Sequence, residues 1–216
     1  MKAMMKVKTA LQLLMICSSY GFATLAQAHS GHDAGIHFMA GLMHPFTGFD
    51  HFLVILLVGF WSAFALKRVY LGPCSLMLGM LGGVAAGLLS VTLSLFEFGI
   101  TFSVIAIGLL LFFKSDLYPK FILVLLSLFG VFHGFAHAEL FSTQFVAADT
   151  GMQLLVLEDA AGLFLATAFL HGCGVLLATS LRGKLTLISK GVGLATLAYG
   201  IFLFGQLSLL TLAGAA

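Results

Sequence analysis

The sequence predicts an all-α membrane protein: a six-helix transmembrane bundle that follows a cleaved signal peptide and has both mature termini in the periplasm. Hydrophobic residues make up 61% of the 216 residues and charged residues only 8%, and the mean hydropathy is +1.13. A soluble domain carries about 25% charged residues, so this chain lacks the polar surface that a globule in water needs. Apolar runs of about 20 residues recur, which is the length that crosses the hydrocarbon core of a bilayer.

The first 28 residues have the three parts of a signal peptide. Lysines at positions 2, 6 and 8 precede an apolar stretch at 9–25, and Ala26-Gln27-Ala28 is an A-x-A cleavage site. The alternative is an uncleaved first helix, but serines, a tyrosine and a glutamine interrupt the apolar run. We therefore expect residues 1–28 to be removed, residues 29–42 to form a periplasmic leader that contains histidines, and residues 43–216 to form one transmembrane domain.

Six apolar segments follow the leader. The seven lysines and arginines outside the signal peptide lie in or beside the connections from the first to the second, the third to the fourth and the fifth to the sixth segment. The positive-inside rule places these connections in the cytoplasm of a bacterial inner-membrane protein, and both mature termini then lie in the periplasm. The helices are expected at about 43–66, 72–94, 98–113, 118–141, 157–180 and 185–212. Small residues at every fourth position predict close helix packing in lipid: Gly79, Gly83 and Gly87 in the second helix, Gly130 and Gly134 in the fourth.

Histidines and an aspartate gather in two of the predicted helices. The first helix opens with His44-Pro45-Phe46-Thr47-Gly48-Phe49-Asp50-His51, and the fourth carries His133 and His137 on one helical face. The first helix runs inward and the fourth outward, so both groups are expected at one depth in the periplasmic half. An ionisable residue inside a membrane costs about 2.5–3.5 kcal/mol on insertion scales, so such a cluster indicates function. Imidazole with carboxylate suits Ni²⁺, Co²⁺ or Zn²⁺, and Asp50 can bind the ion or orient an imidazole.

Other polar residues have less specific sequence signals. Glu139 follows His137 near the periplasmic end of the fourth helix. Cleavage after Ala28 would expose the α-amine and imidazole of His29 beside His32, and short histidine-rich tracts commonly bind metal. Met39 and Met43 leave copper open. The remaining ionisable residues are open between structural and functional roles: Glu97 at the outer end of the second helix, Glu158 and Asp159 at the start of the fifth, and His171 deeper in it.

At these positions the sequence resembles the HupE/UreJ family of nickel and cobalt permeases. The first family pattern, H-P-x-x-G-x-D-H, is matched from His44 to His51, and the second, F-H-G-x-A-H-G-x-E, from Phe132 to His137. Ala138 then replaces a glycine, and Glu139 comes one residue early, which turns a helical side chain by about 100°. The signal peptide, length and six-helix plan are also similar to this family. The resemblance implies uptake of Ni²⁺ or Co²⁺ for metalloenzymes such as hydrogenase or urease.

The sequence therefore predicts an inner-membrane permease for a divalent transition metal and not an enzyme. The expected partners are the lipid bilayer and the transported Ni²⁺ or Co²⁺, with Zn²⁺ and copper left open and no nucleic acid or prosthetic group. Two alternatives use the same histidines: an intramembrane zinc-dependent hydrolase with Glu139 as general base, and a haem-binding electron carrier with paired axial histidines. The sequence leaves open what drives transport, in which direction the metal moves, and whether the chain forms a homo-oligomer. The expected metal ligands are His44, Asp50, His51, His133, His137, Glu139, His29 and His32.

Overall fold

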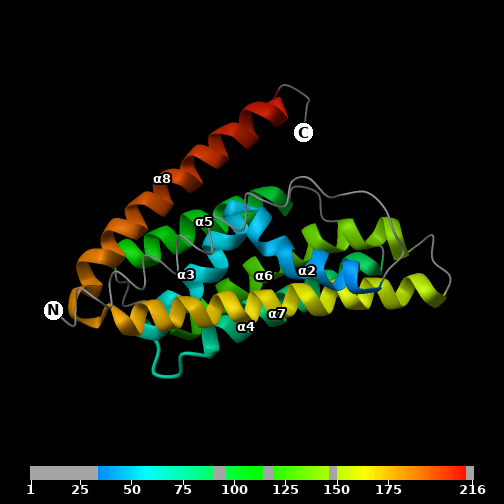
Figure 1. Cartoon of the computed structure of the whole chain (residues 1–216). Coiled ribbons are helices and arrows are strands. Elements are labelled where there is room, and N and C mark those ends of the chain that lie inside the picture. The colour runs from blue at the N-terminus through cyan, green and yellow to red at the C-terminus, as the bar shows by residue number, and fades with distance from the viewer. Residues whose placement is uncertain (1–33, 90–95, 114–118, 146–149, 213–216) are drawn as a thin grey trace.

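A computed structural model describes the backbone of residues 34–89, 96–113, 119–145 and 150–212 and most of their side chains. This part of the chain is helical and contains no strand (Figure 1). The expected signal peptide, together with His29 and His32, lies outside the described residues, and so does the side chain of Glu139. The helices are α2 (Ala34–Thr47), α3 (Phe49–Ala65), α4 (Leu71–Leu88), α5 (Phe96–Phe113), α6 (Pro119–Phe145), α7 (Thr150–Ser180), the 3₁₀ turn η1 (Arg182–Lys184) and α8 (Leu185–Leu212).

The described helices have the length and composition of membrane spans. Five of them, α4 to α8, are long and apolar enough to cross a bilayer, and the bent pair of α2 and α3 would be a sixth span. The chain is thus a multi-pass membrane protein. Its apolar core lies where α3 meets α4, α5, α6 and α7, around Val58, Trp61, Leu76, Val104 and Leu111.

Two expected positions of acidic residues are wrong. Glu97 lies in the first turn of α5 instead of ending the second helix, where a carboxylate interacts favourably with the helix dipole. Glu158 and Asp159 do not begin the fifth helix, because α7 starts at Thr150. No proline in the preceding segment stops the helix, so two further turns place both carboxyl groups inside α7.

The first predicted span, 43–66, is wrong as a single straight helix. It breaks at Gly48, which has an extended backbone (φ −99°, ψ 112°), and the axes of α2 and α3 meet at 82°. Pro45, in the last turn of α2, lacks the N–H that a continuing helix needs. The hydroxyl of Thr47 donates to the backbone oxygen of His44 at 2.8 Å, which satisfies a carbonyl at the end of α2.

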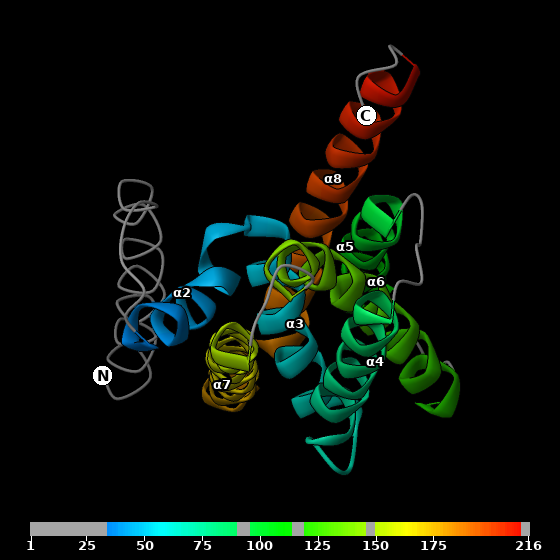
Figure 2. The ribbon, with the colours of Figure 1, turned by 90° about the vertical axis from the view of Figure 1, so that its right-hand side faces the viewer.

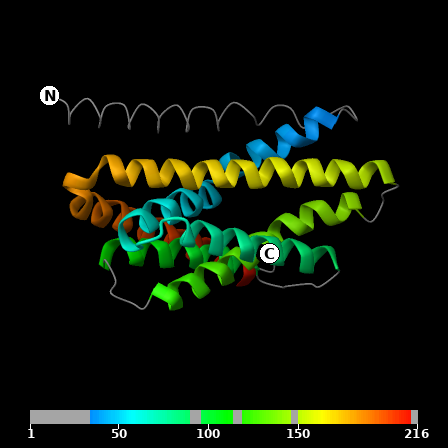
Figure 3. The same cartoon turned by 90° about the horizontal axis from the view of Figure 1, so that it is seen from below.

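The segment N-terminal to this break is helical as well. Residues 34–42, which the sequence places in the leader, form the first part of α2. This helix packs along α7: a Cβ on Gly41 would collide with the backbone oxygen of Asp159, and one on Gly162 with the backbone oxygen of Phe38. Figure 3 shows α7 extending across the molecule beside α2 and α3. Residues 34–42 therefore belong to the packed bundle and not to a leader.

Glycines bring the helices into backbone contact, as the sequence predicts for α4 and α6. A Cβ on Gly83 would lie 3.0 Å from the Cα of Gly134, and a Cβ on Gly134 would lie 2.8 Å from the Cα of Gly83. Comparable contacts join α5 to α8 at Gly108 and Gly193, and join α7 to α2 and α3. We call these three closely packed groups the helix units: α4 with α6, α5 with α8, and α7 with α2 and α3.

The last helix extends beyond the rest of the bundle. Figure 1 shows α8 running along α5, and Figure 2 shows the far part of α8 outside the other helices. This part exposes Phe202, Leu209 and Leu212. Apolar side chains at the surface of a membrane span contact lipid, so the exposure agrees with a helix that crosses a bilayer.

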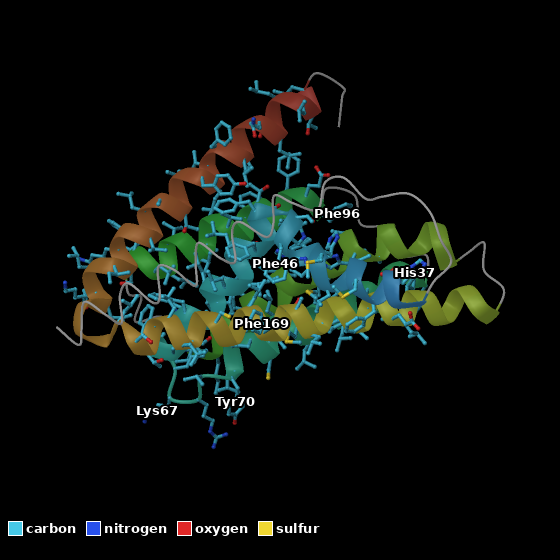
Figure 4. All side chains as sticks on the ribbon, viewed as in Figure 1. His37, Phe46, Lys67, Tyr70, Phe96 and Phe169 are labelled. Carbon is cyan, nitrogen blue, oxygen red and sulfur yellow. The ribbon has the colours of Figure 1, made fainter. Side chains whose placement is uncertain are left out.

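The basic connections gather at one end of the molecule, and this arrangement supports a testable orientation. The α3–α4 connection, the start of α6 and the end of α7 lie at the same end (Figure 3), and Figure 4 shows Lys67 at the opposite end from His37. Reporter fusions after Arg68, Lys120 and Lys184 should therefore report cytoplasm, and fusions near Glu97 and Thr150 should report periplasm. A periplasmic signal at Lys120 would contradict this orientation.

Candidate metal site

Four histidines from three helices meet inside the bundle. His44 comes from α2, His51 from α3, and His133 and His137 from α6. The ring centroids of His51 and His133 lie 4.8 Å apart, those of His44 and His137 4.9 Å, those of His51 and His137 5.5 Å and those of His44 and His51 6.3 Å. These contacts bring together the four histidines that the sequence places at one depth. We call these four residues the histidine cluster.

Asp50 contacts the cluster through His51. One carboxylate oxygen of Asp50 accepts the backbone N–H of His51 at 2.8 Å and lies 3.0 Å from Nδ1 of the same residue. An ionised carboxylate only accepts hydrogen bonds, so Nδ1 carries the proton and Nε2 carries a lone pair. That Nε2 is buried and has no hydrogen-bond partner among the described residues. Of the two roles expected for Asp50, the geometry favours orienting the imidazole.

His133 is held in the same way by a backbone group. Its Nδ1 lies 2.9 Å from the carbonyl oxygen of Phe129, one turn earlier in α6. A carbonyl oxygen also only accepts, so Nδ1 donates and Nε2 of His133 carries the lone pair. The side chain is fully buried, and its Nε2 has no hydrogen-bond partner in the part of the chain that the structure describes. A buried acceptor without a partner costs about 1–3 kcal/mol, which a bound ligand would offset.

The spacing of the rings suits a shared ion, although the nitrogens do not converge as the side chains stand. An imidazole on an ion at 2.0–2.1 Å has its ring centroid roughly 3 Å from it, so two such rings lie roughly 4.5–6 Å apart. The His51–His133, His51–His137 and His44–His137 pairs fall in this range. The rings now meet edge to face or tilted, and the described residues contain no group of three or more donor side chains that would hold an ion unchanged. Binding would require rotation of rings about their side-chain bonds.

A pocket connects this region to the surface. It has a volume of about 340 Å³ and is lined by Asp50 and His51 together with residues of α5, α6 and α8. Its further polar groups come from Glu97, Thr101 and Gln206. The sequence analysis did not single out Thr101 and Gln206. Both are polar residues within apolar segments, and this is the signal that could have identified them. The pocket makes His51 and Asp50 accessible from the surface.

The other predicted residues lie apart from the cluster or outside the described part. His171 is buried in α7, where its Nδ1 donates to the backbone oxygen of Thr167 at 2.9 Å, and it makes none of the ring contacts within the cluster. Asp159 is paired with His37 instead of being solvated at a helix end. The sequence analysis missed this pairing, although His37, His44 and His51 recur every seven residues.

Comparison with known proteins identifies the family. The HupE / UreJ protein family matches residues 16–203, which include the whole histidine cluster. Protein HupE of Rhizobium leguminosarum bv. viciae is 32% identical over 185 residues, which cover 83% of this chain and 86% of the relative. No solved structure matches the chain. With most of its length covered by the family and by a similar relative, the chain belongs to the HupE/UreJ family.

Proposed function

We propose that this chain is an inner-membrane permease that takes up a divalent transition metal, nickel or cobalt, through the histidine cluster and Asp50. Membership of the HupE/UreJ family supports a role in metal uptake and agrees with a transporter instead of an enzyme. The apolar helices agree with a multi-pass position in a membrane. Beyond family membership, we propose the residues of the site, nickel or cobalt as the transported metal, and the inner membrane as the location.

The observation that carries the proposal is the state of two neighbouring imidazoles. His51 and His133 each have Nδ1 engaged by an acceptor and a buried Nε2 without a partner among the described residues, and their rings contact each other. His171 is in the same state but makes none of the ring contacts within the cluster. A metal-binding histidine needs this arrangement, because an acceptor on one nitrogen fixes the tautomer and directs the lone pair of the other toward the ion. Two such nitrogens, on rings 4.8 Å apart, support binding of one ion between α3 and α6.

The donor set favours a borderline divalent ion. Imidazoles with a nearby carboxylate suit Ni²⁺, Co²⁺ and Zn²⁺. The resemblance to nickel and cobalt permeases selects Ni²⁺ or Co²⁺ from this group. A divalent ion falling through about 100 mV gains about 4.6 kcal/mol, which would support roughly a thousandfold gradient without ATP.

Three further residues belong to the proposal. His29 and His32 would collect ions in the periplasm once cleavage exposes the α-amine, and Glu139 would stand near the outer end of α6. No specific observation favours the zinc hydrolase. The haem carrier needs a porphyrin between two imidazoles, whereas the rings of this cluster contact each other directly.

Uptake by the purified protein tests the proposal directly. Proteoliposomes with an inside-negative potential should accumulate radioactive nickel or cobalt, and collapsing the potential should lower the final level. Zn²⁺ and copper, measured in parallel, define the selectivity. Accumulation no greater than in protein-free liposomes, for every metal tested, would overturn the proposed function.

Asp50 gives a graded prediction for the same assay. Asp50→Asn keeps an acceptor oxygen but removes the charge that orients His51 and stabilises its Nδ1–H, so metal affinity should fall by about 10–100-fold. Isothermal titration with Ni²⁺ or Co²⁺ measures this loss. Thr47→Val is a control, since its hydroxyl bonds only to the backbone oxygen of His44. Native affinity in Asp50→Asn would show that the carboxylate charge has no part in binding.

A further inference from the structure

An imidazole and a carboxylate also meet where α2 crosses α7, away from the histidine cluster. Nδ1 of His37 lies 3.4 Å from Oδ2 of Asp159. The backbones of the two helices are in contact here, because a Cβ on Gly41 would collide with the backbone oxygen of Asp159. The positions of the two side chains are therefore fixed by helix packing. Figure 4 shows His37 beside α7, away from the end of the molecule that carries Lys67.

The distance between the two groups fits a shared ion better than a hydrogen bond. Hydrogen bonds from N–H to oxygen span about 2.7–3.2 Å, so the 3.4 Å between His37 and Asp159 is long. Two atoms bound to one tetrahedral ion at 2.0–2.2 Å lie roughly 3.3–3.6 Å apart. A small rotation of either side chain would complete such a pair of bonds.

Asp159 and its neighbour Glu158 each have a carboxylate oxygen without a partner. Oδ1 of Asp159 and Oε2 of Glu158 are both buried, and neither has a hydrogen-bond partner among the described residues. Asp159 is only 7% exposed, and both residues belong to the apolar window Leu157–Ser180 of α7. A carboxylate charge is expensive in such a segment. A divalent cation would compensate that charge and occupy the free oxygens.

We infer that His37, Asp159 and Glu158 form a second binding site for a divalent transition-metal ion, between α2 and α7. As at the histidine cluster, the side chains must rotate to bind, because the described residues contain no group of three donor side chains already placed around an ion. The side chain of His37 is 25% exposed, so water can complete the coordination of a loosely held ion. One nitrogen and carboxylate oxygens suit the same borderline ions as the histidine cluster.

The position of this site gives it a part in uptake that rests on the proposed function. His37 and His44 are seven residues apart on one face of α2, which separates them by about 10 Å along the helix. His44 contacts His137 at the cluster. The second site thus lies close to the first and would raise the local ion concentration beside it. Its existence as a binding site does not depend on transport.

Paired substitutions separate metal binding from a structural ion pair. His37→Lys gives Asp159 a positive partner that cannot act as a ligand while charged, and Asp159→Asn keeps the shape but loses the charge. Both are measured by equilibrium dialysis with Ni²⁺ or Co²⁺ on the purified full chain, in the native background and in a background that carries His51→Gln and His133→Gln. That background removes the cluster's free nitrogens and leaves the second site intact.

We expect each variant to bind about one ion per chain fewer than its parent in both backgrounds. We also expect His37→Lys to raise the metal concentration for half-maximal uptake about tenfold, equivalent to roughly 1.4 kcal/mol, with the same maximal rate. The thermal unfolding midpoint of His37→Lys should stay at the native value. Unchanged metal binding in both variants, with a lower midpoint in Asp159→Asn, would overturn the site and leave a structural ion pair. Metal lost on introducing His51→Gln and His133→Gln, with no further loss from His37→Lys or Asp159→Asn, would support the proposed function and overturn the second site.

Discussion

Replacing either His51 or His133 with alanine should reduce nickel or cobalt uptake to the level of protein-free liposomes, while the protein still inserts in the membrane. Each change removes a buried Nε2 that has no hydrogen-bond partner, and the remaining imidazole would then have to hold the ion largely alone. His137→Ala should have a similarly large effect, because its ring contacts both His44 and His51. The measurement is initial uptake in proteoliposomes that contain equal amounts of folded protein.

Coupling between the ligands gives this prediction a second measurement. Ligands that act as one unit are not additive, so His51→Ala/His133→Ala should be little worse than either single variant. His171→Ala is the matched control, because this buried histidine also bonds a backbone oxygen of its own helix but lies outside the cluster. Normal uptake in the inserted His51 and His133 variants would contradict a shared site and leave these histidines with a packing role.

Substituting alanine for Gly134 should prevent normal assembly of the bundle. The added Cβ would collide with the backbone oxygen of Met80 and lie 2.8 Å from the Cα of Gly83. These neighbours are backbone atoms, which cannot rotate away, so α4 and α6 would have to separate. Overpacking typically costs about 1–3 kcal/mol, and contact with backbone should bring the loss of stability to the upper end of that range. Because Gly134 lies next to His133, the cluster would move as well.

Gly82→Ala is the control for this packing prediction. Gly82 adjoins Gly83 on α4, but nothing lies within 4 Å of a Cβ added there, and alanine has the higher helix propensity. Its thermal unfolding midpoint should equal or exceed that of the native protein, whereas Gly134→Ala should show a lower midpoint and less monodisperse protein by size-exclusion chromatography. Equal midpoints for both variants would mean that α4 and α6 do not approach as closely as the structure places them.

The composition of the cluster could be predicted from sequence because membrane topology restricts side chains to particular depths. His51 near the start of an inward helix and His133 near the end of an outward helix must lie in the same half of a bilayer, and their rings are 4.8 Å apart. The division of roles could not be predicted. Whether Asp50 binds an ion or orients His51 depends on a 3.0 Å contact within one turn of α3, which a sequence does not specify.

The break in the first span was harder to predict than the helix packing. Glycines at four-residue spacing indicate close packing whatever the tertiary structure, and Gly83 and Gly134 meet as expected. Pro45 is favoured in the first turn of a helix, so the sequence predicts a helix that begins there, whereas the structure places Pro45 in the last turn of α2. The pairing of His37 with Asp159 depends on this difference, because it requires α2 to be a helix packed against α7.

The histidine cluster is divided between two helix units. His44 and His51 belong to the unit built on α7, and His133 and His137 belong to the unit of α4 and α6, while contacts between these units are sparse compared with those inside them. Metal–ligand distances tolerate changes of only about 0.2 Å, so an ion bound to both units would cross-link them and fix their spacing. Any movement of one unit relative to the other would lengthen metal–ligand bonds and lower the affinity for the ion. Ion binding and ion release would then correspond to two relative positions of the same two helix units.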